Sequence, residues 1–245
     1  MHDLVRLGTA RYREAQEAGI WNEPVQDEGA KRYYNNIDEY PHIFVLGCLM
    51  DRGVKAEKAW GIPYSVCKLF DAFDMESLSA ISSEEIREWF AENRPHRFNE
   101  KMAEVFYAAV QHIHSVYDDD ASAIWSGRPG SAEVICRFLE FRGAGVKIAT
   151  MATNILTRDY RVELKDRYAI DVSPDIHVRR IFYRLGLIPD EDNREMVIYK
   201  ARELNLEFPG IVDLFCWETG KNYCHPKNPK CVRCPLNSCC EFGKR

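Results

Sequence analysis

The chain has 245 residues, of which 46% are hydrophobic and 12% aromatic, and its formal net charge is -5. This composition supplies enough apolar surface for a folded core and excludes a disordered or low-complexity chain. The first residues lack the apolar stretch of a secretory signal, and the longest apolar run, IFVLGCLM, covers only residues 43–50, which is too short to cross a bilayer. We therefore expect a protein of the cytoplasm or nucleus that is not secreted and has no membrane partner.

The charge is distributed unevenly along the chain. Residues 141–184 contain nine Lys or Arg against five Asp or Glu, and residues 219–245 contain six against one. These two segments together carry +9, so the rest of the chain must carry -14. Basic segments in an acidic body are what a one-sided surface for a polyanion such as nucleic acid requires, although solvated loops can have the same composition.

The apolar spacing predicts helices along almost the whole chain and no convincing pair of strands. In residues 99–117, apolar side chains recur at three- and four-residue intervals from Met102 to Val116, which is one face of a long helix. Ser82 and Glu85 form a capping-box pattern at the start of another helix. We predict an all-α fold, with further helices near residues 2–18, 40–50, 63–73, 131–140, 146–156, 175–186, 192–204 and 208–219.

The sequence FRGAG between two predicted helices indicates a tight helical hairpin. Gly143 and Gly145 permit positive φ and leave no Cβ between the backbone and an approaching group. The first amides of the following helix lack intrahelical partners and lie at the positive end of its dipole, so they can hold a phosphate. The alternative interpretation is an ordinary glycine-containing link between packed helices.

Lys147 falls in the first turn of the helix after this hairpin. The helix dipole disfavours an ammonium group there, which suits an amine that must be neutral to act as a nucleophile and form a Schiff base. A solvated surface lysine is the simpler alternative.

Asp175 follows Ser173-Pro174 and precedes the helical run IHVRRIFYRLG, so we expect it to cap that helix. A carboxylate held rigidly in this way can also stabilise a cation that forms on a substrate. His177 is expected to be a packing or helix-end residue rather than a metal ligand.

Five of the nine cysteines lie in residues 224–240. Cys224, Cys231, Cys234 and Cys240 have the spacing C-x6-C-x2-C-x5-C, whereas Cys239 in the last place would give C-x4-C. Four clustered thiols in a chain without an export signal indicate zinc or an iron–sulfur cluster rather than disulfides. The single Cys-x-x-Cys pair favours the cluster over a zinc ribbon. The other cysteines are expected to be small buried apolar residues: Cys48, Cys67, Cys136 and Cys216.

The order FRGAGVK, DIHVRR and then C-x6-C-x2-C-x5-C resembles the endonuclease III branch of the helix-hairpin-helix (HhH-GPD) DNA glycosylases. The resemblance covers residues from about 40 to the end. It implies two helical domains with a DNA-binding cleft between them: residues 41–170, including the hairpin at about 131–156, and residues 1–40 with 171–245, which carry the cysteine loop.

The resemblance also implies a set of functional residues. Lys147 and Asp175 correspond to the catalytic lysine and aspartate, and Gly143 and Gly145 to the phosphate-binding hairpin, where a monovalent cation can also bind. The segment LGCLMDRG corresponds to the loop that faces the opened base pair, which makes Met50, Asp51 and Arg52 candidates for DNA contact. The four cysteines with C-x6-C-x2-C-x5-C spacing correspond to the ligands of a [4Fe–4S] cluster.

The implied function is base-excision repair of double-stranded DNA by a monomeric glycosylase with AP lyase activity that removes an oxidised base. The alternatives are a monofunctional glycosylase for 8-oxoguanine or a deaminated or mismatched base, and a non-catalytic DNA-binding or redox-sensing iron–sulfur protein. The chain departs from the family pattern in having Arg142 in place of the hairpin proline and a long segment between Lys147 and Asp175. These departures leave the substrate more open than the chemistry.

Overall fold

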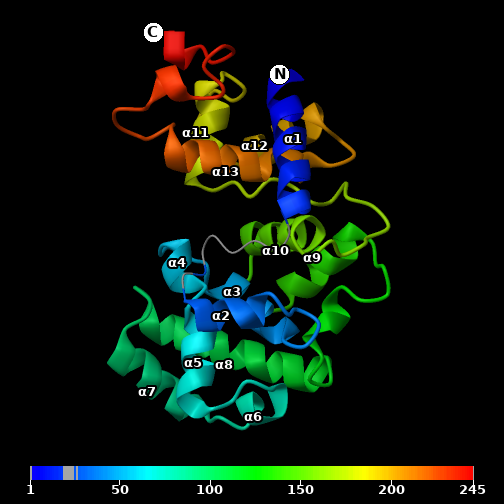
Figure 1. Ribbon diagram of the computed structural model, residues 1–245, viewed down its shortest axis with the longest axis vertical. Helices are drawn as coiled ribbons and strands as arrows, with labels where there is room; N and C mark the ends of the chain where they lie inside the picture. The colour runs from blue at the N-terminus through cyan, green and yellow to red at the C-terminus, as the bar shows by residue number, and fades with distance from the viewer. Residues whose placement is uncertain (1, 19–24, 26, 245) are drawn as a thin grey trace. The chain divides into compact units, whose positions relative to one another are not determined.

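The computed structural model describes residues 2–18, 25 and 27–244 (Figure 1). Every regular element in these residues is an α-helix or a short 3-10 helix, so the predicted all-α fold class is confirmed. No helix within the described ranges has both the length and the apolar content that a membrane span requires. The contacts divide the chain into unit 1, Met1–Gly19, Gly130–Ile135 and Thr153–Arg245, and unit 2, Ile20–Pro129 and Cys136–Ala152. The predicted domain boundaries at residues 41 and 170 stay a prediction.

Unit 2 is built around α3 and α8. All ten residues of α3 (Pro41–Met50) are buried, as expected for a helix that is apolar on every side. Helix α8 (Asn99–Val116) packs against α3, α6 and α7. The remaining helices of this unit are α2 (Glu28–Tyr34), α4 (Ala56–Ala59), α5 (Ile62–Phe70), α6 (Met75–Ser79), α7 (Ser83–Asn93) and the 3-10 helix η1 (Ala121–Ile124).

Two sequence predictions in unit 2 can be compared directly with the structure. The capping box is present, because the Ser82 side chain accepts from the Glu85 amide and the Glu85 side chain accepts from the Ser82 amide. On α8, the predicted inward face is buried from Met102 to Ile113, but Val116 is 53% exposed. The prediction for Val116 is wrong because the helix ends at this residue.

Unit 1 packs α1 (His2–Ala18) against η2 (Pro209–Val212) and α13 (Asp213–Asn222). The ring of Tyr12 meets Phe208 edge to face, with centroids 5.2 Å apart. Gly8 permits the close approach of α1 to η2, since a Cβ on Gly8 would lie 2.9 Å from the Cα of Val212. Helix α13 also packs on α11 (Ile176–Arg184), which contacts α12 (Arg194–Leu204). The cysteine loop carries the short 3-10 helices η3 (Cys231–Arg233) and η4 (Phe242–Lys244).

Helices α9 (Ser131–Leu139) and α10 (Val146–Arg158) each contribute residues to both units. Among the cysteines outside the loop, Cys48, Cys67 and Cys216 are buried as predicted, and Cys136 on α9 is exposed. The prediction for Cys136 is wrong because Val134 and Phe138 form the buried face of α9, and Cys136, two residues from each, lies on the opposite face of the helix.

Candidate functional site

The turn between α9 and α10 has the geometry of a tight glycine hairpin. Gly143 has φ +86°, a conformation that favours glycine, and a Cβ at this position would lie 2.8 Å from Cγ2 of Val105 on α8. Gly145 does not have positive φ, and a Cβ there would meet open space. The predicted helix–turn–helix is confirmed, and of its two glycines only Gly143 has a backbone conformation that favours glycine. The open space at Gly145 leaves the backbone there free for an approaching group.

Lys147 lies in the first turn of α10 and reaches the loop that follows α3. Its Nζ donates to the backbone oxygen of Asp51 at 3.2 Å and lies 3.4 Å from Oδ2 of the same residue. The Lys147 side chain is 38% exposed and the Asp51 side chain 16%. Within unit 2, the structure therefore brings together two of the segments that the sequence marked separately.

The other two residues of that loop differ in exposure. Met50 is fully buried at the end of α3, so its side chain is part of the core of unit 2. Arg52 is half-buried, and its amide donates to the carbonyl oxygen of Met50 at 2.7 Å. Arg52 thus remains a candidate for contact with a ligand, whereas Met50 is enclosed by its own unit.

Asp175 caps the N-terminus of α11, as predicted. Its Oδ1 accepts from the amides of His177 and Val178, both at 2.8 Å. The chain just before Asp175 is also held, because the Ser173 amide donates to Oδ1 of the buried Asp213 at 2.6 Å. The Asp175 carboxyl group is therefore held by two backbone amides of α11, and the chain before it is held by Asp213.

His177 packs inside unit 1, as its sequence context predicted. Its ring meets Trp217 nearly at a right angle, and a Cβ on Gly220 would lie 2.6 Å from its Cβ. Burial lowers the pKa of His177, and the nearby Asp175 partly opposes this effect.

Two arginines of α11 hold the beginning of the cysteine loop. Arg180 is only 3% exposed, and its guanidinium donates to the carbonyl oxygens of Cys224, at 2.6 Å, and Gly220, at 3.2 Å. Arg184 donates to Sγ of Cys224 at 3.2 Å and to the carbonyl oxygen of His225 at 2.8 Å. None of these four contacts could be predicted from the sequence, since the partners lie at least 40 residues away along the chain.

The thiols of the cysteine loop gather in unit 1. Burial raises the pKa of Cys234, and the neighbouring Cys224, Cys240 and Cys231 raise it further. Sγ of Cys240 lies 3.5 Å from the carbonyl oxygen of Arg184, while Sγ of Cys239 is directed to the carbonyl oxygen of Leu236. In the described part of the chain, no group of three or more His, Cys, Asp or Glu side chains is arranged to hold a single metal ion.

The predicted site residues thus fall into two sets, one in each unit. Unit 2 contains Gly143, Gly145, Lys147 and the loop at residues 50–52. Unit 1 contains Asp175 and the cysteine loop. Helix α11 links them, because Asp175 caps its N-terminus and its Arg180 donates to Cys224.

The fold is similar to that of two solved endonuclease III–DNA complexes and of a thymine-DNA glycosylase. A trapped endonuclease III–DNA covalent intermediate, an estranged-adenine complex, superposes with a TM-score of 0.61 at 15% identity, over 88% of this chain and 93% of that chain. A non-covalent endonuclease III–DNA complex gives the same values. A thermostable thymine-DNA glycosylase gives a TM-score of 0.57 at 13% identity, over 84% of this chain and 85% of that chain. No protein-family model matches the chain, and no curated protein matches it in sequence.

Proposed function

We propose that this protein is a base-excision-repair DNA glycosylase with AP lyase activity. The observation that carries the proposal is the position of Lys147, in the first turn of α10 directly after the glycine hairpin, in a chain with the endonuclease III fold. One of the similar structures is named as a covalent endonuclease III–DNA intermediate. A lysine amine is the side chain that forms such a bond with a sugar carbon through a Schiff base.

The target nucleotide must first leave the base stack, because no side chain reaches the sugar carbon C1′ inside the duplex. The lone pair of Lys147 Nζ then attacks C1′, the bond from C1′ to the base breaks, and the base leaves with the bonding electrons and takes up a proton. Nζ loses a proton, the bond from C1′ to the ring oxygen O4′ breaks, O4′ takes up a proton, and a protonated imine forms between Nζ and C1′. Removal of a proton from C2′ breaks the bond from C3′ to oxygen, which cuts the strand. An oxidised base is the substrate we propose.

Asp175 would stabilise the positive charge that develops on the sugar as the base leaves. The two amide donors at 2.8 Å fix the direction of its carboxylate. A rigid, preorganised charge is more effective than a mobile one, because it needs no reorganisation during the reaction. Asp175 therefore combines the cap of α11 with the proposed catalytic role.

The contact between Lys147 and Asp51 supports a second candidate function. Nζ of Lys147 donates to Asp51, and it must give up this contact before its lone pair can attack. In a monofunctional glycosylase, Lys147 would instead keep its charge and bind a phosphate, while Asp175 would activate water. Base release without strand cleavage that survives Lys147→Gln would favour this second function.

We also propose that Cys224, Cys231, Cys234 and Cys240 hold a [4Fe–4S] cluster. The donor set is suitable in its chemistry, since thiolates are the usual ligands of such clusters and Arg184 donates to Sγ of Cys224. The cluster would supply a covalent cross-link for the loop and no step of base removal. This cross-link would hold Lys227, Lys230 and Arg233, all exposed on the loop, in place for contact with phosphates of double-stranded DNA.

The direct test is incubation of the purified protein with a panel of single-lesion and abasic duplexes, with and without sodium borohydride. Borohydride reduces the imine and leaves a stable protein–DNA adduct, which we expect for the wild type and not for Lys147→Gln. Lys101→Gln is the matched control, because Lys101 is an exposed lysine on α8 outside the hairpin. Absence of an adduct on every duplex would refute the lyase role of Lys147, and base release that is indifferent to Asp175→Asn would refute the glycosylase chemistry.

A further inference from the structure

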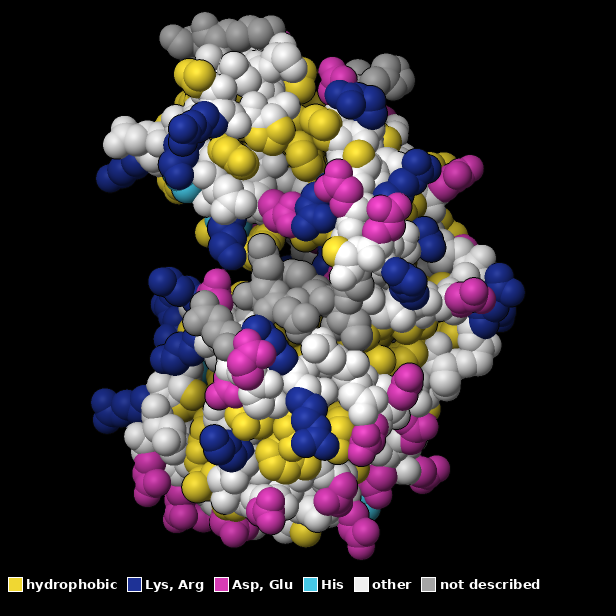
Figure 2. Space-filling model, in the orientation of Figure 1, with side chains coloured by type: hydrophobic (Ala, Val, Ile, Leu, Met, Phe, Trp, Pro, Cys, Tyr) yellow, Lys and Arg dark blue, Asp and Glu magenta, His cyan; other side chains and the backbone are white. Residues whose placement is uncertain are grey.

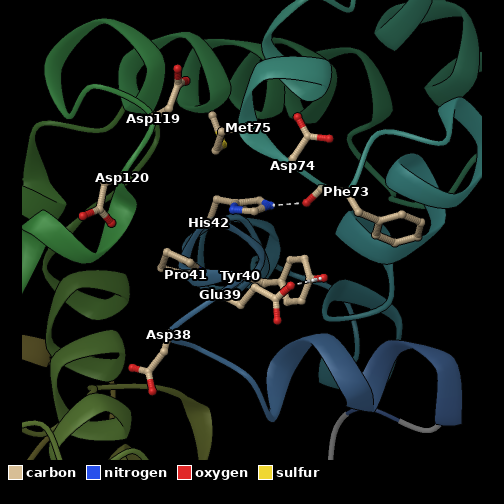
Figure 3. A pocket seen from close by; sticks show the side chains of 10 residues that line it. All are labelled: Asp38, Glu39, Tyr40, Pro41, His42, Phe73, Asp74, Met75, Asp119 and Asp120. Atoms are coloured by element: carbon tan, nitrogen blue, oxygen red, sulfur yellow. Dashed lines mark hydrogen bonds between the residues drawn. The ribbon is translucent and has the colours of Figure 1, made fainter.

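Unit 2 contains a cavity of about 340 Å³ that takes no part in the proposed reaction (Figure 3). Five carboxylates line it, and no Lys or Arg of the described chain does: Asp38, Glu39, Asp74, Asp119 and Asp120. They come from three separate segments, which meet beside the N-terminus of α3. On the face shown in Figure 2, acidic side chains also gather over the end of unit 2 that carries α6 and α7. The cavity therefore has a strongly negative lining.

At the back of the cavity lies His42, whose imidazole is only 2% exposed. Nε2 lies 2.9 Å from the carbonyl oxygen of Phe73, a contact in which this nitrogen must carry the hydrogen. Burial lowers the pKa of His42 to about 4, with the Phe73 carbonyl and Asp74 opposing it, so the ring is neutral at pH 7. Nδ1 must then be a hydrogen-bond acceptor. Within the described residues it has no partner, and Figure 3 shows it on the side of the ring that faces Asp119 and Asp120.

The carboxylates differ in how far the protein already satisfies them. Asp74 accepts from the amide and hydroxyl of Ser77, and Asp120 accepts from the amide of Ser122. Asp38 has no hydrogen bond or ion pair with any described residue. Each of these groups has a second oxygen or lone pair that can still accept. Oδ1 of Asp119 lies 2.8 Å from Nδ1 of His114, and Glu39 accepts from Asn36 and Tyr40. The lining thus offers several acceptors and a buried imidazole nitrogen, and none of the residues that line it is Lys or Arg.

The arrangement of these acceptors indicates which kind of cation the cavity can bind. No three of them are arranged around a single metal ion in the described chain, so the ligand must spread its donors over a wider area. A guanidinium group does this, because it presents five N–H donors in a plane and retains its charge at any ordinary pH. Its flat faces also suit the apolar parts of the lining, which include Pro41, Met75 and the ring of Tyr40.

We propose that this cavity binds a guanidinium group, carried by an arginine side chain of a partner protein or by a small guanidino compound. His42 accepts a hydrogen bond from one N–H, and the carboxylates of Asp38 and Asp120 accept from the others and balance the charge. Neither Lys147 nor Asp175 lines the cavity, so the binding is independent of the glycosylase proposal.

The test uses full-length protein with isotopically labelled histidine and follows the His42 ring by NMR. N-acetyl-arginine amide is the first probe, and N-acetyl-citrulline amide is its control, because citrulline has nearly the same shape without the charge. We expect the arginine probe to shift the His42 resonances and the citrulline probe to leave them unchanged. No shift of His42 with up to about 10 mM arginine probe, or equal shifts with both probes, would overturn the proposal.

The double variant Asp38→Asn with Asp120→Asn removes two charges from the cavity. Asn replaces Asp as a cap at little cost, so the contact with the Ser122 amide is kept, and we expect arginine affinity to fall at least tenfold. The control is Glu88→Gln with Glu92→Gln, which removes two exposed carboxylates from α7 outside the cavity. Equal affinity in the two double variants would contradict the proposal. An arginine-containing peptide that binds more tightly than agmatine would identify a protein partner. Agmatine that binds more tightly than the peptide would identify a small guanidino compound. Either result supports guanidinium binding.

Discussion

Gly143→Ala should destabilise unit 2 strongly, and the structure separates two reasons for this. The residue has φ +86°, and placing an L side chain in the left-handed region costs about 1–2 kcal/mol. The added Cβ would also lie 2.8 Å from Cγ2 of Val105, and overpacking of this kind costs about 1–3 kcal/mol. Together they predict a loss of about 2–5 kcal/mol in the free energy of unfolding.

Gly145→Ala is the matched control, since it changes the same residue type two positions away. There φ is not positive and a Cβ meets no atom within 4 Å, so the free energy of unfolding should change by less than about 0.5 kcal/mol. Urea unfolding can be followed by tryptophan fluorescence, because Trp60, Trp89 and Trp125 are buried in unit 2. Equal stabilities of the two alanine variants would refute the reasoning.

The two contributions can be divided with Val105→Ala. This change removes the Cγ2 atom that the new Cβ would meet and leaves the backbone strain in place. In a double-mutant cycle, Gly143→Ala should therefore cost about 1–3 kcal/mol less in the Val105→Ala background than in the wild type. Full additivity would show that the whole effect comes from the backbone.

Three further variants test the site and the cavity. Asp175→Asn should keep the stability of unit 1 within about 0.5 kcal/mol, because Asn also caps helices, while base release falls at least about 100-fold; Asp175→Ala should lose about 1 kcal/mol as well. Cys240→Ser should abolish the visible absorption of the purified protein and its bound iron, whereas Cys239→Ser should retain both; loss in both variants would contradict the ligand assignment. Since burial lowers the pKa of His42 from 6.5 to about 4, its contribution to stability is complete above pH 6.5 and is lost as the pH falls towards 4, about 3 kcal/mol in all. His42→Gln should flatten this part of the profile of unfolding free energy against pH, and an unchanged slope would contradict the shift.

The features that could be predicted from the sequence depend on short stretches of chain. The turn at Gly143 and the cap at Asp175 are local, because each involves contacts within a few residues. The longer helices were predicted since each repeats an apolar face over several turns. Helices α2, α4 and α6 were missed, as they have only seven, four and five residues and show too little of a period.

The contacts that could not be predicted join distant parts of the chain. Residues 141–184 were expected to supply positive charge to a surface, and α11 contributes three arginines to this segment. Arg180 is instead buried against Cys224 and Gly220, and Arg179 pairs with Asp192 at 2.6 Å. A single sequence does not show which charged side chain turns inward, because this depends on the carbonyl groups that the fold places beside it. Some of the positive charges of residues 141–184 are therefore engaged inside unit 1 and do not contribute to a basic surface.

The contact between Lys147 and Asp51 is the most consequential of these distant pairs, since 96 residues separate the two partners. The helix before Asp51 is anchored in the core of unit 2, because all ten residues of α3 are buried. Asp51 itself caps the end of α3, and the chain turns outward to an exposed Gly53 with φ +66°. Release of Lys147 must therefore take place in the side chains and in residues 51–53. In the proposed reaction, a nucleotide that enters beside the hairpin would have to displace Asp51 from Nζ, so the loop expected to contact DNA would also control when the lysine becomes available.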